Sequence, residues 1–394
     1  MADANKTQIA YGVESTWGTA VGTLKKLRFT GESLNFNITN ISSNEIRSDR
    51  QVTDLIQTGA DCSGGINFEL SYGAFDDLIA GALCNAWTGI DGTNTSVATN
   101  STKTISITTS GTMTAVGFSF NLIKGQSVYL ANAGTNTGAH FVSGFSLTGN
   151  PHIAVLGGTL VSATYSGTMS LAGAHIKNGD TEKSFTLERY VNKATDPDFY
   201  FLFSGMMVNT MQLTVAAAAI CTGSFEFIGK TAVIGTGSND TGGYTEAESN
   251  DVMNGVANVA DIMEGSTLST DLQASGIYFQ DLAFTVNNNL RGRQAIGYMG
   301  NVSVGLGRCD VNGTVTAYFE SKALYDKYVN ATESGLSFKV EKDGKGYIFT
   351  FPRVKFSSDA IAAEGINTDI MERLGFQAIR HAGYDATIIV SRFG

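Results

Sequence analysis

The stretch Ser184-Phe185-Thr186-Leu187-Glu188-Arg189 occurs a second time in the chain, as Ser337-Phe338-Lys339-Val340-Glu341-Lys342. An alternation of aromatic residues follows each stretch, at Phe199, Phe201 and Phe203 and at Tyr347, Phe349 and Phe351. Apolar residues at every second position are typical of a β-strand with one face on a core. The chain therefore contains two versions of one strand-rich segment.

Two further echoes keep the same order along the chain. Leu34, Phe36, Ile38 and Asn40 return as Leu282, Phe284, Val286 and Asn288, and each run leads to an Arg-Gln pair. Gly64, Ile66, Phe68 and Leu70 return as Gly313, Val315, Ala317 and Phe319. Three echoes in one order predict two copies of a single domain. Because chains with repeated units commonly build symmetric assemblies, the pattern points to assembly before catalysis.

The composition favours a β-rich fold. The 394 residues include 46 Gly and only 3 Pro, with 10% aromatic residues, and long amphipathic runs are few. We therefore expect many short strands separated by turns, and little helix. The net charge of −10 argues against a nucleic-acid binder, because such proteins neutralise phosphates with Lys and Arg.

No segment predicts export or membrane insertion. Residues 1–12 lack an apolar core behind a basic start, so we expect no cleaved secretion signal. The densest apolar run, residues 215–221, is far shorter than a membrane span of about 20 residues. The four cysteines lie far apart, without the spacing of zinc or redox sites, and are expected to be free thiols, with disulfides as the alternative.

Two short helices and one long connection are predicted. Residues 74–84 carry apolar side chains at helical spacing, and residues 322–330 are their counterpart in the second copy. Residues 41–58 form a polar connection that is long for a hairpin, and such connections tend to be functional or disordered.

Charge marks an insertion and a linker. Residues 86–174 contain three charged side chains, whereas the stretch from 231 to 290 has eight acids and no Lys or Arg. We interpret the first as a small inserted β domain and the second as an ordered, wrapping linker, with a disordered linker as the alternative. The predicted organisation is a first repeat unit in residues 1–85 and 176–232, an insertion in 86–175, a linker in 233–276 and a second repeat unit in 277–394.

Candidate catalytic and metal sites are weak. The four histidines are scattered without partners at ligand spacing, so no metal site is predicted. The acid pair Asp76-Asp77 opens a predicted helix, where negative charge is favourable, and Asp196-Pro197-Asp198 reads as a turn. No nucleophile elbow, phosphate-binding loop or dinucleotide fingerprint is present. We therefore predict no catalytic residues and no cofactor.

The Arg-Gln segments are the informative polar positions. Basic side chains occur just beyond a strand in both copies, in a chain with 26 basic and 36 acidic residues. A guanidinium group pairs directionally with carboxylates, which favours contacts to a neighbouring subunit over a solvated turn. The predicted contact residues between rings or subunits are Arg47, Arg50, Gln51, Arg291, Arg293 and Gln294.

With these motifs the chain resembles the major tail tube proteins of long, non-contractile-tailed bacteriophages (siphophages), in the variety with two tube domains per chain. The resemblance rests on residues 34–40, the connection to Gln51, residues 64–83, residues 184–189 and their echoes in the second half. It implies two tandem β-sandwich or barrel domains, each with a flanking short helix, and places the insertion on the tube exterior. It also implies three chains per ring, with six tube domains around a lumen, and rings stacked into a tail.

The same resemblance implies the partners and the surroundings. These are further copies of the chain, the tape measure protein, the tail terminator and the distal tail or baseplate proteins, in a virion assembled in the bacterial cytoplasm, without a membrane. Double-stranded DNA would pass through without specific binding, and an acidic wall would avoid phosphate contacts. The lumen-facing acidic candidates, taken from alternating strand positions, are Glu69, Glu188, Glu226, Glu320 and Glu341.

Two other classes compete with this interpretation. An exported surface adhesin or sheath-like β-repeat protein would share the Thr- and Ser-rich composition, but it should carry an export signal. A β-sandwich hydrolase acting on carbohydrate would need paired carboxylates in an aromatic cleft. The chain has only two tryptophans, Trp17 and Trp87, which makes the second alternative the weaker one.

Overall fold

The computed structural model describes residues 4–394 except 92, 93, 95, 147–151, 158, 159, 168, 193–197, 266, 267, 269, 273, 274, 363 and 364. Strands dominate the described residues, which contain two α-helices of seven residues, α1 (Asp76–Ala82) and α2 (Ala323–Val329). The predictions of a mainly β fold and of one short helix in each half are confirmed.

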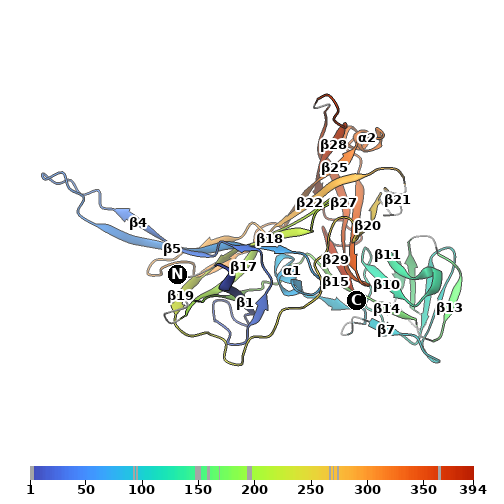
Figure 1. Ribbon diagram of the computed structural model, residues 1–394, viewed down its shortest axis with the longest axis horizontal. Coiled ribbons are helices and arrows are strands. Elements are labelled where there is room, and N and C mark those ends of the chain that lie inside the picture. The colour runs from blue at the N-terminus through green and yellow to red at the C-terminus, as the bar shows by residue number, and fades with distance from the viewer. Residues whose placement is uncertain are drawn as a thin grey trace.

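The first half is a set of strands that surround α1 (Figure 1). It begins with the 3-10 turn η1 (Ala4–Lys6). Its strands are β1 (Thr7–Val13), β2 (Lys25–Leu27), β3 (Gly31–Glu32), β4 (Asn35–Ser42), β5 (Leu55–Glu69), β6 (Thr88–Gly89), β15 (Ala174–Lys177), β16 (Phe185–Val191), β17 (Phe199–Ala216), β18 (Thr222–Gly229) and β19 (Thr231–Gly235).

The second half repeats this plan, with α2 at one end of its strands (Figure 1). Its strands are β20 (Val259–Glu264), β21 (Thr270–Asp271), β22 (Phe279–Asn287), β23 (Arg291–Arg293), β24 (Ser303–Gly305), β25 (Asp310–Tyr318), β26 (Ser334–Lys342), β27 (Lys345–Ala362), β28 (Met371–Ala378) and β29 (Ile389–Phe393).

Strand pairing shows that the halves are equivalent. The neighbour order β4-β5-β18-β17-β16 in the first half matches β22-β25-β28-β27-β26 in the second. Even an irregularity recurs, between Val208 and Thr210 of β17 and between Phe356 and Ser358 of β27. Residues of β27 therefore correspond to residues of β17 with numbers lower by 148. β20 pairs with β26 as β1 pairs with β16, although β20 lies within the segment 233–276 that the sequence assigned to a linker.

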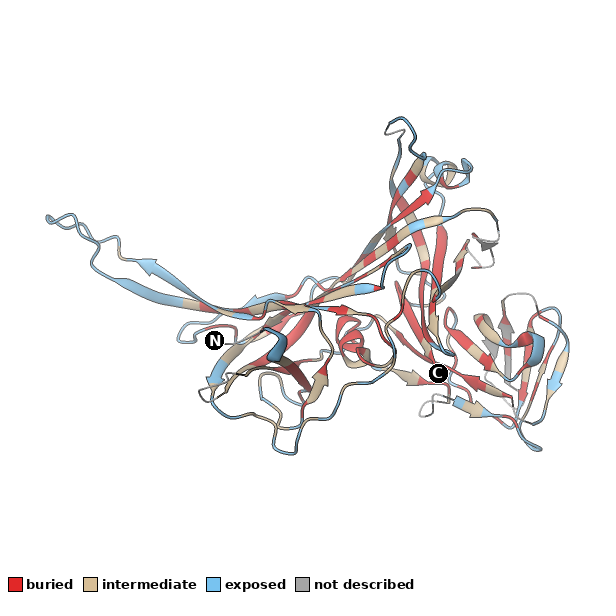
Figure 2. Ribbon diagram, viewed as in Figure 1, coloured by how far each residue is buried: buried red, intermediate tan, exposed pale blue. Residues whose placement is uncertain are grey.

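One core joins the halves. β17 pairs along Thr210 to Ala216 with β22, so the two halves share a single sheet. The buried cluster contains Phe68 and Phe225 from the first half together with Phe284 and Phe349 from the second. Figure 2 shows this buried region continuing across the centre of the molecule.

The segment before β20 lies along the first half. Thr245 bridges Lys25, Val252 bridges Ser71 and Asn254 bridges Ile220 through backbone pairing. Ion pairs join Lys26 to Glu246 at 2.5 Å and Lys25 to Glu248 at 3.2 Å. The acids of this segment are thus partly neutralised by lysines of β2, which fixes it on the surface.

The inserted residues form a separate sheet with its own core, which includes Ile105, Met113, Val128 and Leu171. Its elements are β7 (Ser96–Ala98), β8 (Thr104–Ile107), β9 (Thr112–Val116), β10 (Ser127–Ala131), η2 (Gly134–Asn136), β11 (Gly138–Ser146), β12 (His152–Leu156), β13 (Ala163–Tyr165) and β14 (Ser170–Ala172). This inserted module rests on the end of the second half. Tyr129 stacks on Phe393 at 4.6 Å, and the Ser127 amide donates to Ser391 Oγ at 2.9 Å.

Candidate assembly surfaces

A long arm projects from the first half. β4 and the outer part of β5 extend away from the body, and residues 43–54 form the tip beyond them (Figure 1). The arm exposes apolar side chains that a monomer would normally bury, with Ile46 99% and Val52 71% accessible. Ile41, Leu55 and Ile56 are also more than half exposed. Exposed strand edges and isoleucines on one element are typical of a surface that pairs with another chain.

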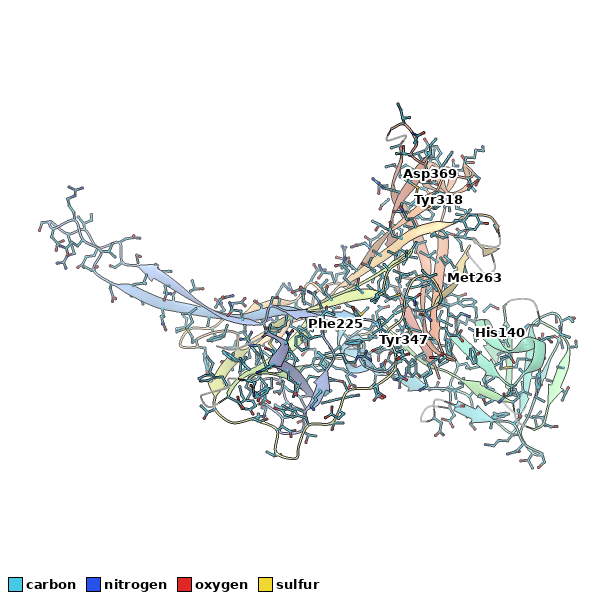
Figure 3. All side chains as sticks on the ribbon, in the orientation of Figure 1. His140, Phe225, Met263, Tyr318, Tyr347 and Asp369 are labelled. Atoms are coloured by element: carbon cyan, nitrogen blue, oxygen red, sulfur yellow. The ribbon has the colours of Figure 1, made fainter. Side chains whose placement is uncertain are left out.

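The arm tip carries three of the predicted contact residues. Arg47, Arg50 and Gln51 are all exposed, and Figure 3 shows side chains projecting in several directions at this end. Arg47 Nη2 lies 2.9 Å from Asp49 Oδ2, and this guanidinium lowers the pKa of the Asp49 carboxyl. Arg50 adopts a φ of 57°, in the left-handed region, at the turn of the tip.

The second half carries a short hairpin in the corresponding place. Arg291 and Arg293 lie on β23, which pairs with β24, and Gln294 follows; all three are exposed. Unlike the arm, this hairpin is anchored on the first half of its own chain. The Leu290 amide donates to Asn209 Oδ1 at 2.8 Å, and Asn301 Nδ2 donates to the Gly229 carbonyl at 2.9 Å. Its tip exposes Ile296, Tyr298 and Met299.

The junction between β17 and β22 is filled within the chain; we call it the closed junction. Leu282, Phe284 and Val286 of β22 are 3%, 1% and 0% exposed. Asn288 Nδ2 donates to the carbonyls of Ala82 and Val208 at 2.9 and 3.0 Å, which ties the second half to the end of α1.

The same surfaces are uncovered at the other end of the repeat; we call them the open junction. By strand register, Leu34, which precedes β4, and Phe36 of β4 take the places of Phe284 and Val286, so the sequence echo is shifted by two residues. Leu34 is buried, whereas Phe36 is half-buried and Ile38, on the same face of β4, is 43% exposed. Residues 357–362 of β27, which correspond to the β17 edge that holds β22, pair on one side with β28 and with no other described strand. The open junction therefore consists of two complementary edges, one at each end of the chain's repeat.

The two helices reflect this difference. Five of the seven residues of α1 are buried, but only Leu324 of α2 is. Near α2, exposed apolar side chains gather at Tyr318, Tyr325, Val329 and Ile370. Figure 3 labels Tyr318 close to this end of the molecule.

The acidic candidates lie in different places. Glu69 is half-buried and Glu226 exposed, and both lie on the face of the sheet opposite the core, because Phe68 and Phe225 point inward. Glu320 is exposed between β25 and α2, away from that face. Glu341 of β26 pairs with Lys339 at 3.1 Å. Glu188 is 1% exposed and accepts hydrogen bonds from Ser238 Oγ, Tyr244 OH and the Asn239 amide, so it is a structural residue with no access to a lumen.

The face that carries Glu69 and Glu226 is mostly uncharged. Successive strand neighbours place amide and hydroxyl side chains in one row, formed by Asn67, Ser224, Gln212, Thr285, Asn312 and Gln377. We call this row the polar band. It crosses from the first half to the second without a break. The polar band was not predicted from the sequence, because only acidic residues were considered as lumen-facing. The alternation of polar and buried positions in every strand is the signal that could have identified it.

A comparison with protein families identifies the family to which the chain belongs. The model of the family described as phage tail tube protein matches residues 4–378, which is nearly the whole chain. The chain belongs to the phage tail tube protein family. No curated protein matches it. Membership makes it a structural component of a virion that assembles with itself into a tube, as the resemblance implied.

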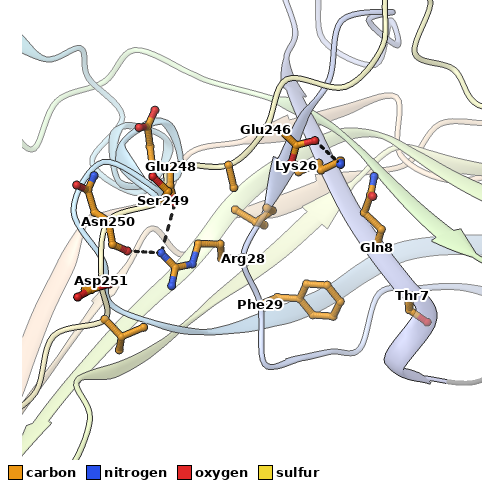
Figure 4. Close-up of a pocket in the computed structure, with 13 residues that line it drawn as sticks. Thr7, Gln8, Lys26, Arg28, Phe29, Glu246, Glu248, Ser249, Asn250 and Asp251 are labelled. Atoms are coloured by element: carbon orange, nitrogen blue, oxygen red, sulfur yellow. Dashed lines mark hydrogen bonds and ion pairs between the residues drawn. The ribbon is translucent and has the colours of Figure 1, made fainter.

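One surface pocket of this tail tube protein lies beside the segment before β20. It has a volume of about 640 Å³ and is lined by β1, β2 and residues 246–252 (Figure 4). Arg28 Nη1 donates to the carbonyls of Glu248, at 3.3 Å, and Asn250. Because its cations are used in holding the segment to β2, the pocket has a structural explanation.

The acid pair Asp76-Asp77 of the tail tube protein also has structural partners. Asp76 accepts a hydrogen bond from Tyr347 OH at 2.5 Å and pairs with Arg392, and Asp77 accepts one from Tyr11 OH at 2.9 Å. Asp196 and Pro197 lie outside the described residues. In the described part of the chain, no group of three or more His, Cys, Asp or Glu could hold a metal ion, and no helix is long and apolar enough to span a membrane.

Proposed function

We propose that this protein is the major tube subunit of a long, non-contractile bacteriophage tail, in which three chains form a pseudo-hexameric ring. The observation that carries the proposal is the open junction. β22 covers the β17 edge inside the chain, whereas the equivalent β27 edge, and the edge of β4 that faces away from β5, pair with no strand among the described residues. A second copy supplies both missing surfaces.

Ring closure follows from repeating the closed junction between chains. If β4 of one copy pairs with residues 357–362 of the next, each new contact adds the same rotation. A ring closes when three such rotations complete one full turn without a shift along the axis. Six similar units per ring, as the resemblance implies, require three chains. The pairing would bury Phe36 as Val286 is buried, and it would remove two exposed strand edges.

The polar band would then line the lumen. It lies opposite the core on strands that would continue from chain to chain, so its hydroxyl and amide groups form the inner surface. Glu69 and Glu226 add negative charge, which repels the phosphates of double-stranded DNA during ejection. The same face also carries Arg373 and Lys355. Most of its other side chains are uncharged or acidic and give DNA phosphates no cation to bind, which suits a conduit.

The arm and the short hairpin are the proposed contacts between rings. Head-to-tail contacts along an axis do not close, so they extend rings into a filament. Ile46 and Val52 supply apolar area for such a contact, and Arg47, Arg50 and Gln51, with Arg291, Arg293 and Gln294, supply directional polar groups. The tape measure, terminator and baseplate proteins, and assembly in the bacterial cytoplasm, remain implications of the resemblance.

A disulfide between copies tests the ring. Residues paired across antiparallel strands have Cα atoms about 4.5–5.5 Å apart, a separation that a disulfide spans. We expect Asn37→Cys combined with Ser358→Cys to give dimers and trimers on a non-reducing gel, and nothing larger, from particles that appear as rings or tubes by negative-stain microscopy.

Each single-cysteine variant is the matched control, because it keeps all four native thiols, of which Cys309 is partly exposed and Cys62, Cys84 and Cys221 are buried. Absence of linked species from well-folded protein would contradict the strand pairing. A ladder that continues beyond three chains would contradict the trimer.

A further inference from the structure

Two carboxyl groups lie next to each other on the core-facing side of the sheet, at the open junction. Asp359 of β27 pairs with Leu374, and two positions further along Ile361 pairs with Glu372 of β28, which is 2% exposed. Both oxygens of Asp359 and Oε1 of Glu372 are buried and accept no hydrogen bond from the described residues. Two buried carboxylates without donors cannot both remain ionised at low cost, so the pair tends to share a proton.

The first half has apolar groups in the same places. By the strand correspondence, Asp359 takes the place of Met211, which is 3% exposed, and Glu372 that of Gly223. The ring of Phe68 fills the space over Gly223, because a Cβ added there would lie 2.4 Å from Phe68 Cζ. Ala317 echoes Phe68 and leaves that space to Glu372. The carboxyl pair thus occurs at the open junction and is absent from the closed one.

The charged side chains around the pair are directed elsewhere. On β28, Arg373 follows Glu372 and points to the opposite face, as Lys355 of β27 does. On α2, Lys322 pairs with Asp326 at 3.2 Å and Lys327 with Glu264 at 2.5 Å. β25 presents Ala317 beside Glu372.

Burial and the charge of the neighbouring acid therefore determine the pKa values of the two carboxyl groups. Burial, and then the Asp359 charge, raise the pKa of Glu372 to about 7, and burial also raises the pKa of Asp359. The pair changes its protonation near neutral pH, where an isolated carboxyl would already be fully ionised.

We propose that the Asp359–Glu372 pair couples closure of the open junction to the uptake of a proton. The inference rests on the proposed function, because the covering surface is β4 of the next copy, with Phe36 opposite Asp359 in the register of the closed junction. Asp359 is half-buried in the free chain, although its carboxyl oxygens are out of contact with water. An apolar cover removes the water next to the rest of this residue and makes the surroundings of the pair less polar. The doubly ionised pair is then disfavoured, and closure favours the protonated form.

The test is the pH dependence of the association between chains. With one proton taken up per contact, the association constant of the unmodified chain, measured by sedimentation, should fall by up to about tenfold per pH unit between pH 7 and 9. Glu372→Gln removes the shared proton, and its amide donates to Asp359. We expect this variant to associate equally at pH 6 and pH 9. Glu182→Gln, at an exposed acid in the turn before β16, should keep the dependence of the unmodified chain.

The outcomes separate the two proposals. If the cysteine pair at positions 37 and 358 links copies but association is the same from pH 6 to 9, or if folded Glu372→Gln keeps the full dependence, proton coupling is wrong and the ring stands. If the copies neither link nor associate at any pH, both proposals are wrong. Should Glu372→Gln lose its fold by circular dichroism, Asp359→Asn decides in its place, with the same flat profile expected.

Discussion

The closed and open junctions are built from equivalent strands, yet they differ in what covers them. At the closed junction, α1 is buried, β22 lies on β17, and Asn288 satisfies two carbonyls of the first half. At the open junction, α2 is exposed and the edges of β4 and β27 lack described partners. The difference shows that, in a chain with an internal duplication, the contact between the two halves can serve as a model for the contact between neighbouring chains.

Deleting residues 46–53 should have the largest effect on assembly, because it removes the part of the open side that extends farthest from the body. The remaining residues 43–45 and 54 can close β4 to β5, and the core is untouched. We expect a folded chain that forms rings or small oligomers but no tubes in negative-stain images. Removing the corresponding apolar tip of the short hairpin, Ile296→Ser with Met299→Ser, is the matched control and should weaken elongation less. Tubes of normal length from the deletion variant would contradict the role of the arm.

Alanine substitution of one phenylalanine at each junction should cost different amounts of unfolding free energy. Phe284 is buried against Phe338, Phe349 and Phe351, so Phe284→Ala should cost about 3–5 kcal/mol of unfolding free energy. Phe36→Ala should cost about 1 kcal/mol in the free chain, because Phe36 is half-buried there. Urea denaturation of the unassembled protein measures both values. Equal losses would show that β4 is already covered in the free chain.

The pH dependence of the unfolding free energy should distinguish His175 from the acid pair of the open junction. Burial lowers the pKa of His175, on β15, to about 4. Because the unfolded chain binds this proton near pH 6.5, the stabilisation is complete above that pH and is lost as the pH falls toward 4, by about 2 kcal/mol at pH 5. His175→Gln should remove this loss when urea midpoints at pH 7 and pH 5 are compared. Glu372→Gln should shift the profile in the opposite sense, since its raised pKa favours the folded state at low pH.

The smallest expected effect concerns the asparagines that echo each other. Asn288→Ala leaves the carbonyls of Ala82 and Val208 without their donor and should cost about 1–2 kcal/mol. Asn40→Ala, on the exposed arm, should change the stability of the free chain by less than about 0.5 kcal/mol. Thermal unfolding of the unassembled chain checks both. A larger loss for Asn40→Ala in assembled particles would place Asn40 in a contact between copies.

The sequence predicted those parts of the fold in which apolar and polar residues alternate along a strand. The echo of residues 184–189 in 337–342 identified β16 and β26, and helical spacing identified α1 and α2. The role of β20 was not predictable, because its acids suggested a linker and its pairing with β26 depends on distant residues. Glu188 shows the same limit, since alternation cannot tell an acid on the open face from one buried under Tyr244.

The candidate site was predictable only in part. The Arg-Gln pairs marked the arm and the short hairpin because they follow equivalent strands. The open edge of β27 was not visible, since whether a strand edge is occupied depends on which other strand reaches it. The carboxyl pair was equally hidden, because Asp359 and Glu372 are 13 positions apart and meet only through the register of β27 and β28.

The inserted module offers a place to carry foreign sequence. It rests on the second half through β10, where Tyr129 meets Phe393, while the turn between β8 and β9 is exposed at residues 108–110. Gly111 has to stay, because a Cβ there would come within 2.3 Å of the Leu156 carbonyl oxygen. A peptide grafted between Thr109 and Ser110 would therefore leave both junctions intact, and every subunit would display one copy of the graft.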